Sequence, residues 1–404
     1  MKKIFCLLLP LAVLAASCSK DRTPAPAAVN QYLISAVKAG TVQKAFLQAA
    51  LSSYPDYASY ATLPGTNVSL YRVSYYTEYP RGTKIAASGV LMVPDNLDPA
   101  FPAVVYTHGS IVKADAPSRR IASPLNYTAE VMVGAVMSSA FDCAVVMPDY
   151  VGYGDSESIT HPYNHARSLG QASLDIILAF REYCVSAGLS FNDKVLITGY
   201  SEGGFAALAL DRMIQEGSTG LQVVKTVAGS GAYDNVAFAK AFLGQNADLD
   251  PSFLSTYLWA MQMYKTDFAY SKSYDDIFSA ADNPVLKAAG YNMAYYGTYY
   301  LPIDTNPSLL FKKEFVDGVL TGSDTEFMNI LSDNSLTGFV PADSVIFVCG
   351  TSDTWVYPVN TYNAYNAMTA RGCKVKLYKC EGGDHTTTVP TYMDVVLARL
   401  RMTY

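Results

Sequence analysis

Val195-Leu-Ile-Thr-Gly-Tyr-Ser-Glu-Gly-Gly-Phe205 is the stretch of the sequence that decides the fold. The apolar run from Val195 to Thr198 predicts a buried strand, and residues 205–213 predict a helix. Between them lies a Gly-x-Ser-x-Gly pattern with Ser201 at its centre. A sharp strand-to-helix turn of this kind holds the serine in strained backbone geometry and exposes its hydroxyl as a nucleophile. The pattern also arises by chance, so its weight depends on the rest of the chain.

Apolar runs of strand length recur along the chain, and helix-like segments lie between most of them. Continuous apolar runs are typical of strands that are covered on both faces, as in a parallel sheet. Their alternation with helices predicts an α/β fold with a mostly parallel, doubly wound sheet. The predicted strands are 103–106, 143–147, 195–198, 223–228, 345–349 and 375–378, and the predicted helices are 126–140, 168–187, 205–215, 360–371 and 392–401.

The segment before these strands has a different pattern. Residues 68–79 and 84–93 alternate apolar and polar side chains, which predicts an antiparallel hairpin at the sheet edge. Its turn falls at Pro80-Arg-Gly82. Residues 31–53 predict one or two helices broken near Gly40.

A long interval separates the predicted strand 223–228 from the strand 345–349. It is far too long for one crossover, and it contains helix-like pieces and many tyrosines. We interpret residues 233–338 as a helical lid insertion over the carboxyl ends of the strands. The insertion belongs to a single domain that spans residues 31–404.

The N-terminus carries the features of an export signal. In residues 1–17, two lysines precede a short apolar run that cannot span a bilayer. Leu14-Ala-Ala-Ser-Cys18 resembles a bacterial lipobox, in which the cysteine is acylated; the alternative is an ordinary signal peptide with Cys18 incidental. Residues 18–30 are rich in Pro and Ala, which favours a tether. We therefore expect an exported protein, lipid-anchored to the outer membrane on its periplasmic or surface face.

Charge and cysteine content exclude several classes of partner. The net charge is −6, and it becomes 27 − 35 = −8 without the two lysines of the signal, so nucleic acid is not an expected partner. Five cysteines remain after Cys6 and Cys18, an odd number that allows at most two disulfides. Cys143 and Cys349 lie in apolar runs and are expected to be buried. The sequence contains no C-x-x-C pair, so a zinc or redox site is not expected.

A nucleophilic serine needs a base, and the base needs an orienting carboxylate. His385 follows the last predicted strand, and Asp353 follows the strand before it. The order Ser201, Asp353, His385 is the order that α/β-hydrolases use. Asp384 is the rival acid, but as the neighbour of His385 in the chain it cannot easily reach the ring's Nδ1 while the ring faces the serine.

The developing oxyanion needs hydrogen-bond donors. We expect the backbone N–H of Glu202 to be one, and the N–H of Ser110 or Gly109, after the first parallel strand, to be the second. His108 is expected to pack under this loop. The Glu202 carboxylate has two interpretations. It is either a solvated or hydrogen-bonded acid at a helix start, or a functional group that contacts the substrate or acts on His385 as a nearby negative charge.

Two further segments resemble one branch of the α/β-hydrolases. Pro148-Asp-Tyr-Val-Gly-Tyr-Gly-Asp-Ser156 and His161-Pro-Tyr-Asn-His165 resemble the secretory-lipase branch of the α/β-hydrolases, over roughly residue 51 to the C-terminus. The resemblance implies an α/β-hydrolase fold and the hydrolysis of carboxylic esters without metal or organic cofactor. It also implies Ser201, Asp353 and His385 as the triad. The spacing of the two histidines is that of a metal pair on a helix, but the intervening proline favours a loop.

The aromatic insertion bears on the substrate. Its tyrosines are typical of a helical core, but exposed Tyr and Trp also stack on sugars or line acyl pockets. Because we expect a surface lipoprotein, we expect its substrate to be a small ester or an acylated glycan, such as one with acyl or feruloyl decorations. Short-chain lipid esters are the next expected substrates. Two alternatives remain: a serine aminopeptidase on the same fold, and a non-catalytic glycan-binding lipoprotein.

Overall fold

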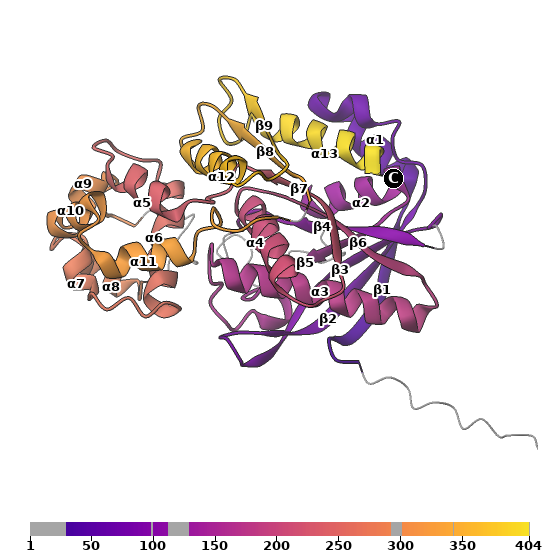
Figure 1. The fold of residues 1–404 in the computed structure, drawn as a ribbon, viewed down its shortest axis with the longest axis horizontal. Coiled ribbons are helices and arrows are strands. Elements are labelled where there is room, and N and C mark those ends of the chain that lie inside the picture. The colour runs from indigo at the N-terminus through magenta and orange to yellow at the C-terminus, as the bar shows by residue number, and fades with distance from the viewer. Residues whose placement is uncertain (1–29, 98–99, 112–128, 292–300, 342, 404) are drawn as a thin grey trace, which may run out of the picture. The chain divides into compact units, whose positions relative to one another are not determined.

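The structure is a computed structural model that describes residues 30–97, 100–111, 129–291, 301–341 and 343–403. The predicted signal peptide, the Cys18 lipidation site and residues 18–29 of the tether lie outside this part of the chain. Within the described residues, one nine-stranded sheet has the strand order β1-β2-β3-β5-β4-β6-β7-β8-β9 (Figure 1). The neighbouring pairs β1–β2, β2–β3 and β3–β5 are antiparallel, whereas all pairs from β5 onward are parallel.

The predicted parallel strands and flanking helices are all present. The strands are β1 (Leu33–Val42), β2 (Val68–Glu78), β3 (Lys84–Pro94), β4 (Phe101–Thr107), β5 (Ala144–Pro148), β6 (Phe191–Tyr200), β7 (Gln222–Gly229), β8 (Val345–Gly350) and β9 (Val375–Cys380). The helices that flank the sheet are α1 (Lys44–Ser52), α2 (Ala129–Phe141), α3 (Ala166–Ala187), α4 (Glu202–Glu216), α12 (Val359–Ala370) and α13 (Val389–Thr403), with short 3-10 turns at Pro55–Tyr60 and Gly154–Ser156.

The apolar run before the serine is continuous because both faces of the sheet are covered. Leu196 packs among side chains of α2 and α13. Val195 and Ile197 point to the other face, where they pack among side chains of α3 and α4. All three are fully buried, and burial of each aliphatic side chain contributes about 1.5–3 kcal/mol. The strand that leads to Ser201 is therefore rigid, which fixes the height of the serine above the sheet.

The prediction for residues 31–53 was wrong in its first half. Residues 33–42 form strand β1, which pairs antiparallel with β2 from Leu33↔Tyr75 to Val42↔Val68. Gly40 adjoins a register shift in this ladder and breaks no helix. Pairing with β2 satisfies the backbone hydrogen bonds that a helix would otherwise make. The predicted hairpin of β2 and β3 is present, but β1, and not the hairpin, forms that edge of the sheet.

The residues between β7 and β8 form a helical insertion, and Figure 1 shows its helices grouped together beyond the carboxyl ends of the parallel strands. Aromatic side chains of the insertion share one apolar cluster with Leu169 and Phe205 of the helices α3 and α4. No described helix combines the length and hydropathy needed to cross a membrane. The described helices of the insertion are α5 (Asn235–Leu243), α6 (Pro251–Thr266), α7 (Tyr274–Ile277), α8 (Asn283–Ala288), α9 (Pro307–Leu310), α10 (Lys313–Thr321) and α11 (Thr325–Asp333).

Candidate active site

Ser201 occupies a strained turn between β6 and α4. Its φ of 59° and ψ of −126° lie outside the regions that residues with a side chain ordinarily adopt. The turn is too tight for side chains at the two positions that lie two residues before and after the serine. A Cβ on Gly203 would lie 2.1 Å from the carbonyl oxygen of Thr107, and one on Gly199 would lie 2.3 Å from the carbonyl oxygen of Gly203. The glycines are therefore required by the close approach of β4 to the turn.

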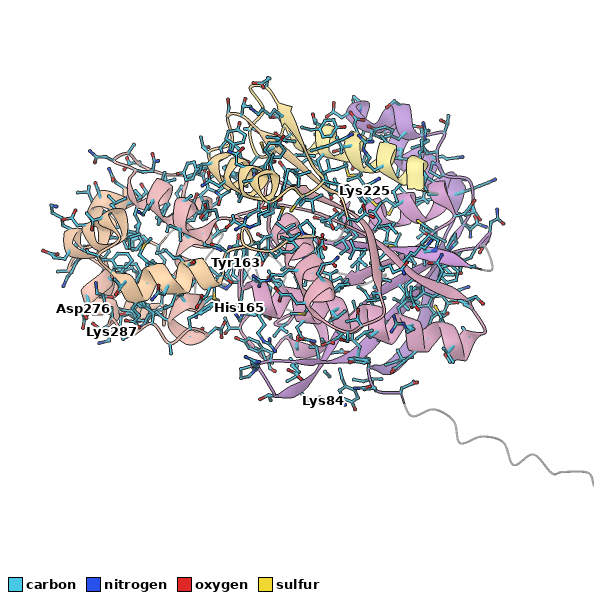
Figure 2. All side chains as sticks on the ribbon, in the orientation of Figure 1. Lys84, Tyr163, His165, Lys225, Asp276 and Lys287 are labelled. Atoms are coloured by element: carbon cyan, nitrogen blue, oxygen red, sulfur yellow. The ribbon has the colours of Figure 1, made fainter. Side chains whose placement is uncertain are left out.

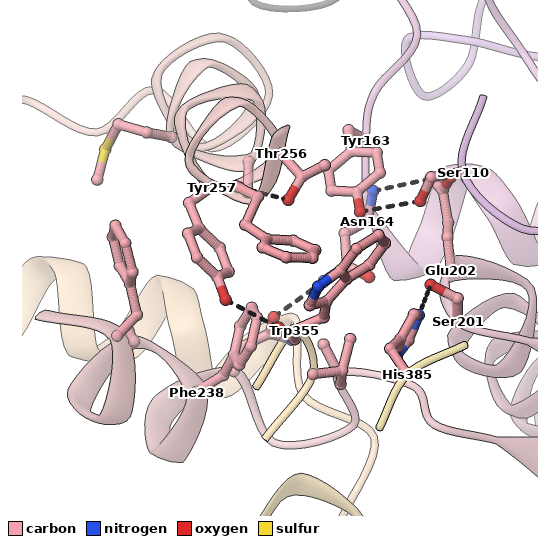
Figure 3. A pocket seen from close by; sticks show the side chains of 18 of the residues that line it. Ser110, Tyr163, Asn164, Ser201, Glu202, Phe238, Thr256, Tyr257, Trp355 and His385 are labelled. Atoms are coloured by element: carbon pink, nitrogen blue, oxygen red, sulfur yellow. Dashed lines mark hydrogen bonds between the residues drawn. The ribbon is translucent and has the colours of Figure 1, made fainter. Parts of the chain in front are cut away.

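The structure brings the three predicted triad residues together. His385 Nε2 lies 2.9 Å from Ser201 Oγ, and His385 Nδ1 lies 2.7 Å from Asp353 Oδ2. The other carboxylate oxygen of Asp353 accepts hydrogen bonds from the N–H groups of Trp355 and Val356, each at 2.9 Å. Asp353 is 3% exposed and His385 is 7% exposed. Three loops that follow β6, β8 and β9 thus form one hydrogen-bonded chain, whose Ser201–His385 bond is drawn in Figure 3.

The rival acid, Asp384, has a different role. Its carboxylate is exposed and accepts hydrogen bonds from the N–H groups of Thr386 and Thr387. The bonds from Thr387, ahead of that from Thr386, hold the pKa of this carboxyl below its usual range. Asp384 therefore caps the turn that carries His385 and is not the acid that contacts the ring.

The two proposed oxyanion donors come from different segments, the start of α4 and the loop after β4. Glu202 is the first residue of α4, so its N–H has no acceptor within the helix. In the loop after β4, the N–H of Gly109 points to Glu130 Oε1 at 3.4 Å. That contact leaves the N–H of Ser110 as the better second donor. His108 is fully buried, as predicted, and its Nδ1 donates to the carbonyl oxygen of Gly109 at 2.7 Å.

A cavity of about 460 Å³ opens at Ser201 and His385 and extends into the helical insertion. Ser110, Tyr163 and Asn164 line one side of the cavity, and Trp355 and Tyr257 line another (Figure 3). The wall farther from Ser201 is apolar and is built largely by α5, α6 and α11, with side chains that include Phe238, Phe242, Met261, Phe311, Phe327 and Leu331.

Several residues at this site were not identified from the sequence. Glu130 binds the oxyanion loop and also accepts a hydrogen bond from Tyr106. Trp355 stacks on His385 with ring centroids 5.2 Å apart. The hydroxyl of Tyr163 shares a hydrogen bond with Ser110 Oγ at 3.0 Å. These contacts join distant segments, so no local pattern in the sequence marks them; only the position of Trp355 two residues after Asp353 was a usable signal.

The side chain of Glu202 is buried and hydrogen-bonded, not solvated. It is 1% exposed, and its Oε1 lies 2.9 Å from His161 Nε2. The predicted loop at His161-Pro-Tyr-Asn-His165 is present, with only its last residue directly preceding α3. Within the described residues, no cluster of His, Cys, Asp and Glu is arranged to hold a metal ion. The cysteines of the described chain are free thiols, and Cys143 and Cys349 are buried as predicted.

The strained serine turn, the mostly parallel sheet and the Ser–His–Asp geometry define the chain as an α/β-hydrolase. Residues 127–402 match the model of the secretory lipase family, so the chain belongs to that family and is an exported carboxylic ester hydrolase. A comparison with curated protein sequences found no match.

Solved structures share this fold at low sequence identity. A proposed hydrolase of Legionella pneumophila superposes with a TM-score of 0.79 at 21% identity, covering 92% of this chain and 98% of that one. A G231F mutant of the rice cell wall degrading esterase LipA of Xanthomonas oryzae gives 0.77 at 19% identity, with coverage of 92% and 98%. Candida antarctica lipase A gives 0.60 at 14% identity, with coverage of 90% and 82%.

Proposed function

We propose that the protein hydrolyses carboxylic esters through an acyl-enzyme on Ser201. His385 Nε2 takes the proton of Ser201 Oγ as the oxygen attacks the ester carbonyl, and the imidazolium then donates that proton to the leaving alcohol. Asp353 fixes the ring tautomer and stabilises the imidazolium. Water, activated by the same histidine, then releases the acid. The observation that carries this proposal is the pair of hydrogen bonds of 2.9 Å and 2.7 Å on the two ring nitrogens of His385.

The charge that develops on the carbonyl oxygen is stabilised by the N–H groups of Glu202 and Ser110. Both belong to the protein backbone at rigid positions, one at a helix start and the other in a loop held by Glu130. Preorganised donors of this kind contribute about 2.7–4 kcal/mol each to the transition state.

The shape of the pocket indicates which part of the ester it takes. Its apolar wall inside the insertion suits an apolar or aromatic acyl group, because such a group loses contact with water there. We place the alcohol part at Trp355, which lines the pocket, is 40% exposed and offers a ring on which a sugar can stack. We therefore propose acyl or feruloyl esters of glycans as substrates. The fold shared with a cell wall degrading esterase supports this choice, and short-chain lipid esters are the alternative.

A serine aminopeptidase would need an acidic anchor for the substrate amine. The Glu202 side chain cannot supply one, since it is buried against His161. A non-catalytic glycan-binding role has no use for a hydrogen-bonded Ser–His–Asp chain. The geometry thus favours ester hydrolysis over both alternatives.

The test compares p-nitrophenyl esters of increasing acyl length with aminoacyl p-nitroanilides. We expect turnover of the esters, and its loss in Ser201→Ala. Ester turnover that survives in Ser201→Ala rejects the mechanism, and faster cleavage of the anilides by the native protein rejects the substrate class. A panel of acetylated and feruloylated oligosaccharides against glycerides, ranked by kcat/KM, then separates glycan esters from lipid esters.

We also propose that Cys18 carries a lipid that anchors the exported chain to the outer membrane, with residues 18–30 as the tether. The lipobox-like sequence supports this proposal. Metabolic labelling with a fatty acid should mark the native protein but not Cys18→Ser. Equal labelling of both would exclude this site of lipidation.

A further inference from the structure

A buried acid–base pair lies next to the nucleophile in the chain. His161 Nε2 and Glu202 Oε1 are 2.9 Å apart, and the two side chains are 0% and 1% exposed. The N–H of Asn164 donates to the same carboxylate oxygen at 3.2 Å. Ester hydrolysis at Ser201 uses only the backbone N–H of Glu202, which leaves the buried carboxylate at this position without a role.

The hydrogen bonds of His161 fix the number of protons in the pair. Its Nδ1 lies 2.6 Å from the carbonyl oxygen of Val151, which can only accept, so Nδ1 carries a hydrogen. The contact between Nε2 and Glu202 also needs one proton between its two atoms. The pair is therefore either an imidazolium with a carboxylate or an imidazole with a carboxylic acid. In both forms its net charge is zero.

Among the described residues, Glu202 has no other neutralising group. No described lysine or arginine forms an ion pair with it, and its second oxygen, Oε2, is buried without a partner among the described residues. Burial, and after it the Glu202 carboxylate, raises the pKa of Tyr150 and of Tyr153 well above the usual range, so these phenols stay neutral. A charge on this carboxylate without His161 would lie in an aromatic, water-poor environment, where electrostatic effects are large.

We propose that His161 is a positioning residue for ester hydrolysis: it neutralises the Glu202 carboxylate and holds residue 202 in place as an oxyanion donor. The inference rests on the proposed function of Ser201. An uncompensated carboxylate on the donor residue opposes the negative charge that forms on the substrate oxygen in the transition state. Substrate binding involves no such charge, so the effect falls on the chemical step.

The loop that carries His161 also reaches the other donor and the insertion. Tyr163 shares a hydrogen bond with Ser110, and its ring stacks on Trp259 of α6 at 4.7 Å. Trp259 Nε1 in turn donates to the carbonyl oxygen of His161 at 3.0 Å. Figure 2 places Tyr163 at this junction of the insertion with the sheet. The same short loop thus contacts both residues that are proposed as oxyanion donors, Glu202 and Ser110.

Three variants test the charge balance: His161→Gln, Glu202→Gln and the double variant. The net charge of the pair is 0 in the native protein and −1 in His161→Gln when the carboxylate is ionised. It is 0 again in both proteins that carry Glu202→Gln, because the amide is neutral and can donate to a neutral imidazole. With p-nitrophenyl butyrate, we expect kcat of His161→Gln to fall about 10- to 100-fold with KM changed less than about threefold. The double variant should recover most of the kcat that His161→Gln loses, and Glu202→Gln is measured as its reference.

The outcomes separate a charge effect from a purely structural one. Native kcat in His161→Gln, or a double variant no faster than His161→Gln, overturns the proposal. Thermal unfolding checks that each variant is folded. If His161→Gln does not fold, the double variant decides, because a folded double variant with kcat at least 100-fold below that of Glu202→Gln also overturns it. Ser201→Ala keeps the two claims apart: activity in that variant refutes the proposed function, whereas its inactivity beside a native-like His161→Gln refutes only the role of His161.

Discussion

Replacing Asp353 by asparagine tests the hydrogen-bonded chain at its buried end. The carboxylate uses Oδ1 to accept from two backbone N–H groups, those of Trp355 and Val356, and Oδ2 to accept from His385. An asparagine has one oxygen and one NH₂ for these two places. Turning the NH₂ toward the backbone would leave two buried N–H donors unpaired, at about 1–3 kcal/mol each.

The preferred orientation therefore puts the NH₂ against His385 Nδ1. It is lower in free energy than the other orientation by at least about 2 kcal/mol, so the two are populated in a ratio of roughly 30 to 1. An amide that donates to Nδ1 forces the ring hydrogen onto Nε2, and Nε2 can then no longer accept the proton of Ser201. In the minor orientation, a neutral oxygen stabilises the imidazolium less than a carboxylate does. Together these effects predict a kcat about 10³–10⁴-fold lower, with little change in folding.

The assay is kcat on a p-nitrophenyl ester, corrected by titration of active serines with a phosphonate. Asp384→Asn is the matched control, since that side chain accepts only from its own turn and should keep kcat within about twofold. Retention of more than a tenth of native kcat in Asp353→Asn, or an equal loss in the control, would refute the assignment of the acid.

Three further expectations follow from other contacts. Gly203→Ala should lower the melting temperature or abolish folding, because its Cβ would lie 2.1 Å from a Thr107 oxygen; native thermal stability would contradict this. Ala239→Phe, on the pocket wall, should cut kcat/KM for long acyl esters while sparing acetyl esters, and a uniform change along the series would argue against an acyl pocket there. Burial raises the pKa of Asp211 to about 6, so this acid favours the folded state below pH 4 and loses that effect, about 3 kcal/mol, as the pH rises to 6. Denaturant unfolding of Asp211→Asn should therefore depend less on pH between 4 and 6; an unchanged pH dependence would contradict the shift.

Most of the scaffold and the three catalytic groups of the site could be predicted from the sequence. Most of the parallel strands are continuous apolar runs because both of their faces are covered, so these runs could be read directly. Ser201, Asp353 and His385 each follow such a run, and parallel strands bring their carboxyl ends to one edge. The order of the elements along the chain was therefore enough to predict that the three residues meet.

The rest depends on partners that lie far apart in the chain. Strand β1 pairs only with β2 on its one side, so its identity is decided by that neighbour and not by its own pattern. His161 and Glu202 are 41 residues apart, and the histidine looked like part of a loop motif. The apolar wall of the pocket is built largely by α5, α6 and α11, which the irregular aromatic spacing did not indicate.

The insertion leaves the sheet at the end of β7 and returns at the start of β8, and these strands are direct neighbours, with Thr226 opposite Val345. A segment whose two ends are held by adjacent strands can change in length or sequence without moving the scaffold. Ser201, Asp353 and His385 all lie outside it, after β6, β8 and β9. Natural variation in the insertion can therefore change the acyl group that is accepted while the bond-breaking machinery is inherited intact, and a chimaera carrying a relative's insertion is a direct route to a new substrate range.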